Sequence, residues 1–131
     1  MTIKVGFLGC GLMTKRRASA LPGGIAAAGY DIDPRRVEAL QQSIRDVRAC
    51  HAPSELFEHC DVVLVSTPHA YLAEHALAAI EAGRHVLIEK PGACRPTELD
   101  PLIDAATRRG VKRLATARSV TVRPSWPAVV T

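Results

Sequence analysis

Short apolar runs alternate with helical segments along most of the chain, and this alternation is the feature that most limits its fold. The apolar runs, which we expect to be strands, cover residues 3–9, 24–33, 47–50, 61–67, 85–89 and 111–115. The segments of helical composition or periodicity cover residues 12–21, 34–44, 53–60, 70–83 and 95–110. Continuous apolar strands that alternate with helices are typical of a parallel sheet covered on both faces. The pattern therefore predicts a doubly wound α/β fold with three layers.

Length and composition fit one globular domain. The chain has 131 residues, of which 47% are hydrophobic and 23% are charged, and these are ordinary values for a soluble domain. No apolar run approaches the roughly 20 residues that span a bilayer. The start, "MTIKVGFLGCG", resembles a strand and a glycine turn rather than a signal peptide. We therefore expect a cytoplasmic protein without a membrane partner.

The net charge of +4 comes from the end of the chain. Residues 1–107 hold 11 Lys and Arg against 13 Asp and Glu, whereas residues 108–131 hold six basic residues and no acid. A basic stripe with interleaved aromatic residues, the usual sign of nucleic-acid binding, is missing from the body. We expect no nucleic-acid partner. The domain is predicted to cover residues 1–115, followed by a basic, irregular tail at 116–131.

The cysteines do not form a metal motif. Cys10, Cys50, Cys60 and Cys94 are spread without Cys-x-x-Cys spacing, which favours free thiols in a reducing compartment. Cysteine and histidine are adjacent at positions 50–51 and again at 59–60. Zinc ligands usually stand two to five residues apart, because one backbone rarely aims two neighbouring side chains at one ion. We expect no metal site.

A glycine turn follows the first predicted strand. Residues 9–14 read "GCGLMT", with glycine in the first and third places. Such glycines allow a tight turn and a close approach of a pyrophosphate to the backbone, and the next helix offers its free N–H groups to the anion. Thr14 stands where the full fingerprint has glycine or alanine, so the match is partial. A tight strand-to-helix turn without a ligand would also need glycine.

Asp31 strengthens the dinucleotide hypothesis. It lies 22 residues after Gly9, at the end of the second predicted strand, where an acid would accept hydrogen bonds from an adenosine ribose. Alternatively, the "DIDP" segment only caps the next helix through Asp33, and both roles are compatible. The charge of Asp31 would repel a 2′-phosphate and so favours NAD over NADP. Arg35 and Arg36 leave NADP open.

Three segments resemble a known family. "VGFLGCG", "STPHAYLAEHALAAIEAGRHVLIEKPGA" and "LIDAATRRGVK" are similar to the N-terminal half of the Gfo/Idh/MocA oxidoreductases, over roughly residues 3–115. The order and spacing from Ser66 to Pro91 are the most specific part. The resemblance implies a Rossmann domain that binds NAD(P) and takes part in hydride transfer with a sugar- or polyol-type secondary alcohol.

The resemblance also implies roles by position. It places Lys90 by the nicotinamide and the substrate, as the catalytic residue. A lysine near a cationic ring and partly desolvated would have its pKa lowered toward the range of a proton carrier. The implied cofactor-binding residues are Gly9, Gly11, Leu12, Met13, Asp31, Ser66, Thr67, Pro68, His69, Glu89 and Lys90.

The chain departs from the family after residue 115. Relatives continue into a second domain that supplies most substrate contacts, and the residues 116–131 do not resemble its start. We therefore expect cofactor binding with little turnover by this chain alone, and a small-molecule substrate only if a second domain is supplied. A stand-alone dinucleotide module or sensor, and an inactive truncated remnant, remain alternatives. A homo-oligomer is also left open.

Overall fold

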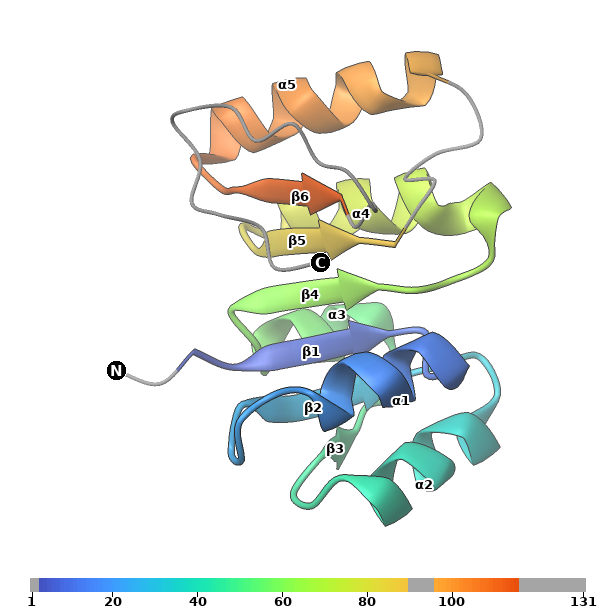
Figure 1. Cartoon of the computed structure of the whole chain (residues 1–131). Coiled ribbons are helices and arrows are strands. Elements are labelled where there is room, and N and C mark those ends of the chain that lie inside the picture. Colours follow the sequence, from blue (N-terminus) through green and yellow to red (C-terminus); the bar gives the residue numbers. More distant parts are fainter. Residues whose placement is uncertain (1–2, 90–95, 116–131) are drawn as a thin grey trace.

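The chain folds around one six-stranded parallel sheet. The computed structural model describes residues 3–89 and 96–115. The strands are β1 (Val5–Leu8), β2 (Ala26–Tyr30), β3 (Arg48–Ala49), β4 (Val62–Val65), β5 (His85–Ile88) and β6 (Arg113–Ala115). They lie in the order β3-β2-β1-β4-β5-β6, and every neighbouring pair is parallel (Figure 1). The strand order reverses between β1 and β4, where the chain returns to the middle of the sheet.

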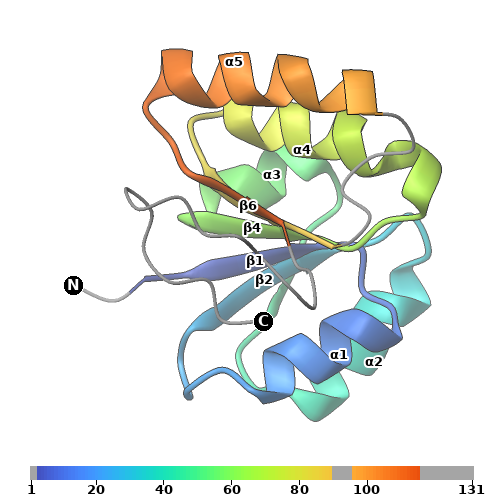
Figure 2. The ribbon, with the colours of Figure 1, turned by 45° about the horizontal axis from the view of Figure 1, so that its top comes forward.

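Helices cover both faces of the sheet, which confirms the predicted three-layer fold. α1 (Leu12–Ser19) and α2 (Pro34–Ser43) lie on one face. α3 (Pro53–Glu58), α4 (Leu72–Glu81) and α5 (Leu99–Arg109) lie on the other (Figure 2). Short 3₁₀ turns, η1 (His69–Tyr71) and η2 (Pro96–Glu98), lead into α4 and α5. In the described ranges, no helix is long and apolar enough to cross a membrane.

Local sequence signals explain where two of the helices begin and end. The Asp33 side chain accepts a hydrogen bond from the Arg35 N–H at 3.1 Å, and Pro34 is the first residue of α2. After α4, Gly83 has a φ of 79°, and the Arg84 N–H bonds the Ala79 carbonyl at 3.0 Å. The left-handed glycine and the hydrogen bond from residue 84 back to residue 79 form a common C-terminal capping motif of a helix.

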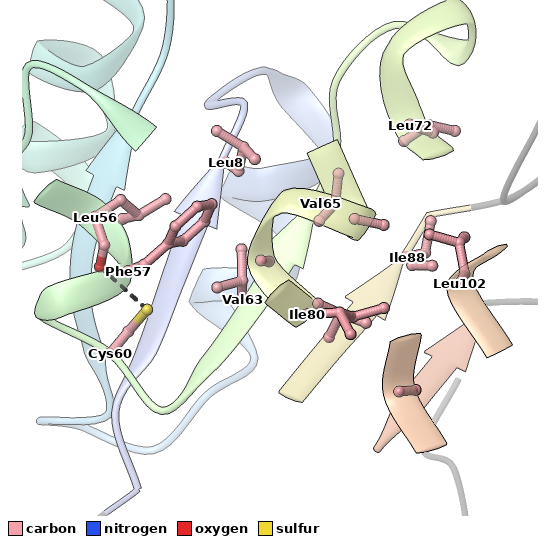
Figure 3. Close-up of a cluster of buried hydrophobic side chains, with 14 of the residues drawn as sticks. Leu8, Leu56, Phe57, Cys60, Val63, Val65, Leu72, Ile80, Ile88 and Leu102 are labelled. Carbon is pink, nitrogen blue, oxygen red and sulfur yellow. Dashed lines mark hydrogen bonds between the residues drawn. The ribbon is translucent and has the colours of Figure 1, made fainter. Parts of the chain in front are cut away.

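The core consists of two hydrophobic clusters, one on each face of the sheet. Successive strand residues point to opposite faces, so Val63 and Val65 join the cluster under α3, α4 and α5, while Leu64 joins the one under α1 and α2. Figure 3 shows the larger cluster, in which Leu56, Ile80 and Leu102 of the helices pack against strand residues. This two-sided burial explains why the strands read as continuous apolar runs.

The predicted division at residue 115 remains a prediction. β6 ends at Ala115, and the predicted tail, residues 116–131, lies outside the described residues.

Candidate functional site

Four of the predicted site residues form one row across the carboxyl edge of the sheet. Each of the four is the first residue after a strand: Asp31 follows β2, Gly9 follows β1, Ser66 follows β4 and Glu89 follows β5. The last residues of these strands are in register. The N–H groups of Gly9, Ser66 and Glu89 bond the last carbonyl of the neighbouring strand at 2.8, 2.9 and 3.0 Å. With about 4.8 Å between strands, the row spans roughly 14 Å. It crosses the reversal of strand order, where open α/β sheets bind ligands.

The two glycines of the turn have different surroundings. Gly9 has a φ of +92°, and a Cβ there would lie 2.7 Å from the Ser66 carbonyl oxygen. Gly9 is therefore required by the close contact between β1 and β4. Gly11 has nothing within 4 Å of an added Cβ, so its lack of a side chain is not required by the protein's own packing. The open side of the turn is at Gly11.

The first turn of α1 begins at this open side. Gly11 is the N-cap and provides no side-chain hydrogen bond, so the first N–H groups of α1 lack the usual side-chain acceptor. Leu12 and Met13 are exposed in this turn, at 66% and 39%. Thr14, the departure from the fingerprint, is fully buried, and its hydroxyl donates a hydrogen bond to the Gly9 carbonyl. The threonine thus braces the turn from inside, where a smaller residue would leave space.

Asp31 holds the glycine turn through its side chain. One carboxylate oxygen accepts the Cys10 N–H and the other the Asp33 N–H, both at 2.9 Å. The Asp31 side chain is only 6% exposed, and the Arg36 guanidinium lies 4.0 Å away. Asp33 caps α2, so the two aspartates have separate structural roles. This hydrogen bond from the turn to Asp31 was not foreseen, because the sequence motif relates Asp31 to a ligand and not to the turn itself.

Burial of the turn suppresses the chemistry of Cys10. Desolvation, with a further contribution from the Asp31 charge, raises the pKa of the Cys10 thiol to about 12. Burial likewise raises the pKa of Cys60 to about 11. Cys10, Cys50 and Cys60 are free thiols, as predicted, and all three are buried, while Cys94 lies outside the described residues. These buried thiols are structural, because a nucleophilic cysteine needs an accessible thiolate.

The segment after β4 is held by a histidine that sequence reasoning passed over. The His75 ring nitrogen Nδ1 lies 2.9 Å from the Thr67 hydroxyl, and the ring stacks on Tyr71. Burial lowers the pKa of His75, which favours the neutral ring. His69 was the only histidine that we expected near the cofactor; it is exposed at the start of η1, next to Pro68. Positions 67 and 75 are close because η1 turns the chain back into α4.

The Ser66 hydroxyl is an unsatisfied buried group in the row. Its Oγ is buried and has no hydrogen-bond partner within the described part of the chain. Buried hydroxyls normally have a partner, and an exception calls for an explanation. A ligand at the end of β4 would supply one.

Glu89 is bound by a residue of α1. Arg17 Nε donates to Glu89 Oε1 at 2.8 Å and Arg17 Nη2 to Oε2 at 3.4 Å. The Glu89 side chain is 9% exposed and that of Arg17 is 29% exposed. Sequence reasoning missed Arg17, although its position three residues after the buried Thr14 places it on the sheet-facing side of α1. Lys90 lies outside the described residues.

The described residues contain no group of three or more His, Cys, Asp or Glu side chains that could hold a metal ion. The row does fit a dinucleotide, because it combines an open glycine turn, a helix N-terminus without a side-chain cap and an unsatisfied hydroxyl.

Comparisons with known proteins agree with this geometry. A family model described as an oxidoreductase family with an NAD-binding Rossmann fold matches residues 3–117. The NADP⁺-dependent scyllo-inositol 2-dehydrogenase IolW of Bacillus subtilis is 33% identical over 84% of this chain and 32% of its own length. Inositol 2-dehydrogenase 3 of Saccharopolyspora erythraea is 33% identical over 87% of this chain and 35% of its own.

Solved structures share the fold. UDP-N-acetylglucosamine 3-dehydrogenase GnnA from Acidithiobacillus ferrooxidans superposes with a TM-score of 0.80 at 27% identity, over 88% of this chain and 37% of that one. The WlbA dehydrogenase from Bordetella pertussis, in complex with NADH and UDP-GlcNAcA, gives 0.81 at 25% identity, with coverage of 88% and 37%. The chain thus spans about a third of the length of these relatives.

Proposed function

The chain belongs to the Gfo/Idh/MocA family of oxidoreductases, and on this premise we propose that the row at the carboxyl edge of its sheet binds NAD. The adenosine ribose would bind at Asp31, and the pyrophosphate would lie over Gly11 and the first turn of α1. The observation that carries the proposal is the difference between the two glycines. Gly9 is enclosed by β4, whereas Gly11 leaves open space where a phosphate could approach the backbone.

The nicotinamide half would then lie along the ends of β4 and β5. Leu12 and Met13 would flank the pyrophosphate, and Ser66, Thr67, Pro68, His69 and Glu89 would line the remaining part. Ser66 Oγ would gain the partner that it lacks in the protein alone. The hydrogen bond between His75 and Thr67 would fix the orientation of the Thr67 hydroxyl at the end of β4.

We propose NAD as the preferred cofactor. The buried Asp31 carboxylate would accept hydrogen bonds from ribose hydroxyls and repel a 2′-phosphate. Arg36 is the residue that could reverse this preference, because its guanidinium lies near Asp31 and its side chain is 60% exposed. Relatives of both kinds exist, since IolW is named for NADP⁺ and WlbA was solved with NADH.

For the reaction, we propose oxidation of a sugar- or polyol-type secondary alcohol, with Lys90 as the catalytic residue. Bound NAD would accept the hydride that leaves the carbinol carbon. Lys90 Nζ would take or return the proton of the hydroxyl. Since the chain covers about a third of its relatives, we propose that it binds cofactor alone and turns over substrate only with a second domain.

The first test is a calorimetric titration of the chain with NAD⁺ and NADP⁺. We expect saturable binding that is tighter for NAD⁺. In Arg36→Gln, NADP⁺ binding should weaken while NAD⁺ binding stays within about twofold, because the lost contact is with the 2′-phosphate, which only NADP⁺ carries. Arg35→Gln is the matched control, since Arg35 pairs with Asp33 on the same turn. A folded chain that binds neither nucleotide would refute the proposal.

A second test addresses turnover. Reduction of NAD⁺ by the chain alone, followed by absorbance with inositol or glucose as substrate, should be negligible. Robust turnover that is lost in Lys90→Gln would overturn the need for a second domain and support the catalytic lysine.

A further inference from the structure

We propose that Arg17 is a positioning residue for the nicotinamide end of the site, and that it acts through Glu89. The inference rests on the proposed function and adds a residue that belongs to neither the glycine turn nor the strand ends. Its basis is the two-point contact between the Arg17 guanidinium and the Glu89 carboxylate, which joins α1 to the end of β5.

The direction of the Glu89 side chain follows from the sheet. Leu87 packs with the cluster under α1 and α2, whereas Val86 and Ile88 pack on the opposite face. Glu89 is two residues after Leu87, so strand alternation turns its side chain to the face that carries α1. Its backbone N–H is bonded to the Val65 carbonyl at 3.0 Å. The residue is thus tied to β4 by its backbone and to α1 by its side chain.

The carboxylate in this position requires a cation. Glu89 is 7% exposed as a residue, and a buried carboxylate is costly unless it is paired and hydrogen-bonded. Arginine meets this need with two N–H groups in a fixed plane, and a lysine could not supply the same two-point geometry. The hydrogen bond to Glu89 in turn raises the pKa of Arg17, so the guanidinium stays charged.

The position of the pair in the row decides which half of a ligand it affects. Asp31 follows β2 at one end of the row, and Glu89 follows β5 at the other, three strands away. If adenosine binds at Asp31, the nicotinamide half extends toward Glu89. Release of Glu89 from α1 would therefore disturb the β5 end and leave the contacts at Asp31 and the glycine turn intact.

The test compares two ligands that differ only in the nicotinamide ring. NAD⁺ and ADP-ribose are titrated calorimetrically into the wild-type chain, Arg17→Gln and Arg17→Lys. In Arg17→Gln we expect NAD⁺ to bind about tenfold more weakly, as for a lost charge-assisted contact, and ADP-ribose to bind within about twofold of wild type. Arg17→Lys should fall between, because it keeps the charge without the two-point contact. Arg16→Gln, an exposed neighbour on α1, is the control and should change neither ligand.

A second set shows whether Arg17 acts through Glu89 and guards against misfolding. Glu89→Gln removes the charge that Arg17 pairs with and keeps a side chain of similar size, and thermal unfolding verifies the fold of each variant. In this background, adding Arg17→Gln should change the ratio of NAD⁺ to ADP-ribose affinity much less than it does in wild type. Equal effects in both backgrounds would overturn the inference, as would equal weakening of both ligands in a folded Arg17→Gln. Failure of the wild type to bind either ligand would instead refute the proposed function.

Discussion

Replacement of Gly9 by alanine should destabilise the domain strongly. The φ of +92° is strained for a residue with a Cβ, at a cost of roughly 1–3 kcal/mol. The new Cβ would also lie 2.7 Å from the Ser66 oxygen and 2.8 Å from its carbonyl carbon. Those are backbone atoms at the end of a central strand, so relief requires β1 and β4 to separate, at a further cost of roughly 1–3 kcal/mol. The sum, roughly 2–6 kcal/mol, is a large part of the 5–15 kcal/mol typical of a domain.

Gly11→Ala is the matched control two residues away. Its Cβ meets nothing within 4 Å, and its φ of −84° is ordinary for alanine. Alanine is a poorer N-cap than glycine, but it reduces the entropy of the unfolded chain, so the net change should stay within about 1 kcal/mol. The added methyl group would, however, occupy the open side of the turn. We therefore expect Gly11→Ala to fold normally and to lose NAD⁺ binding.

Thermal unfolding and NAD⁺ titration of both variants provide the assay. At about 4 °C per kcal/mol, Gly9→Ala should lower the melting temperature by roughly 8 °C or more, and Gly11→Ala should shift it by less than about 4 °C. A Gly9→Ala protein as stable as wild type would refute the close contact between the strand ends. A stable Gly11→Ala protein with wild-type affinity for NAD⁺ would show that no phosphate approaches the turn.

Three further predictions concern side chains around the row. Thr14→Val should destabilise the domain by about 1 kcal/mol in urea unfolding, because the Gly9 carbonyl loses its hydrogen-bond donor. Thr14→Ser should recover most of the loss, and a Thr14→Val protein as stable as wild type would contradict the bracing role. Stability should decline as the pH falls below 6.5, because burial lowers the pKa of His75 in the folded chain and the unfolded chain therefore takes up the proton more readily. A pH series of melting temperatures should show a weaker decline for His75→Gln, and identical profiles for the two proteins would refute this. With a pKa of about 12, only about one Cys10 thiol in 10,000 is a thiolate at pH 8. Mass spectrometry after iodoacetamide treatment should therefore find Cys10 unlabelled in the folded protein and labelled in urea, and rapid labelling without denaturant would show that the turn opens.

The sequence by itself determined the layers of this protein and singled out the candidate residues of its site. Strand and helix periodicities are local properties, so six apolar runs and the segments between them were enough to predict a parallel sheet covered on both faces, which the protein has. Helix boundaries were also readable, because Asp33 and Gly83 act on their immediate neighbours. The glycine turn and Asp31 were predicted as dinucleotide-binding residues because that ligand's chemistry requires those residue types at nearly fixed spacing.

The tertiary structure decided the contacts that join distant segments. The Glu89 carboxylate is bonded by Arg17, 72 residues earlier in the chain. Asp31 braces the turn at Cys10, and His75 rather than His69 bonds Thr67. The difference between Gly9 and Gly11, identical in type, exists only because β4 lies against one of them. Each of these contacts depends on strand register and on the face that a helix presents. Both are settled by packing between distant elements, and the local sequence does not encode that packing.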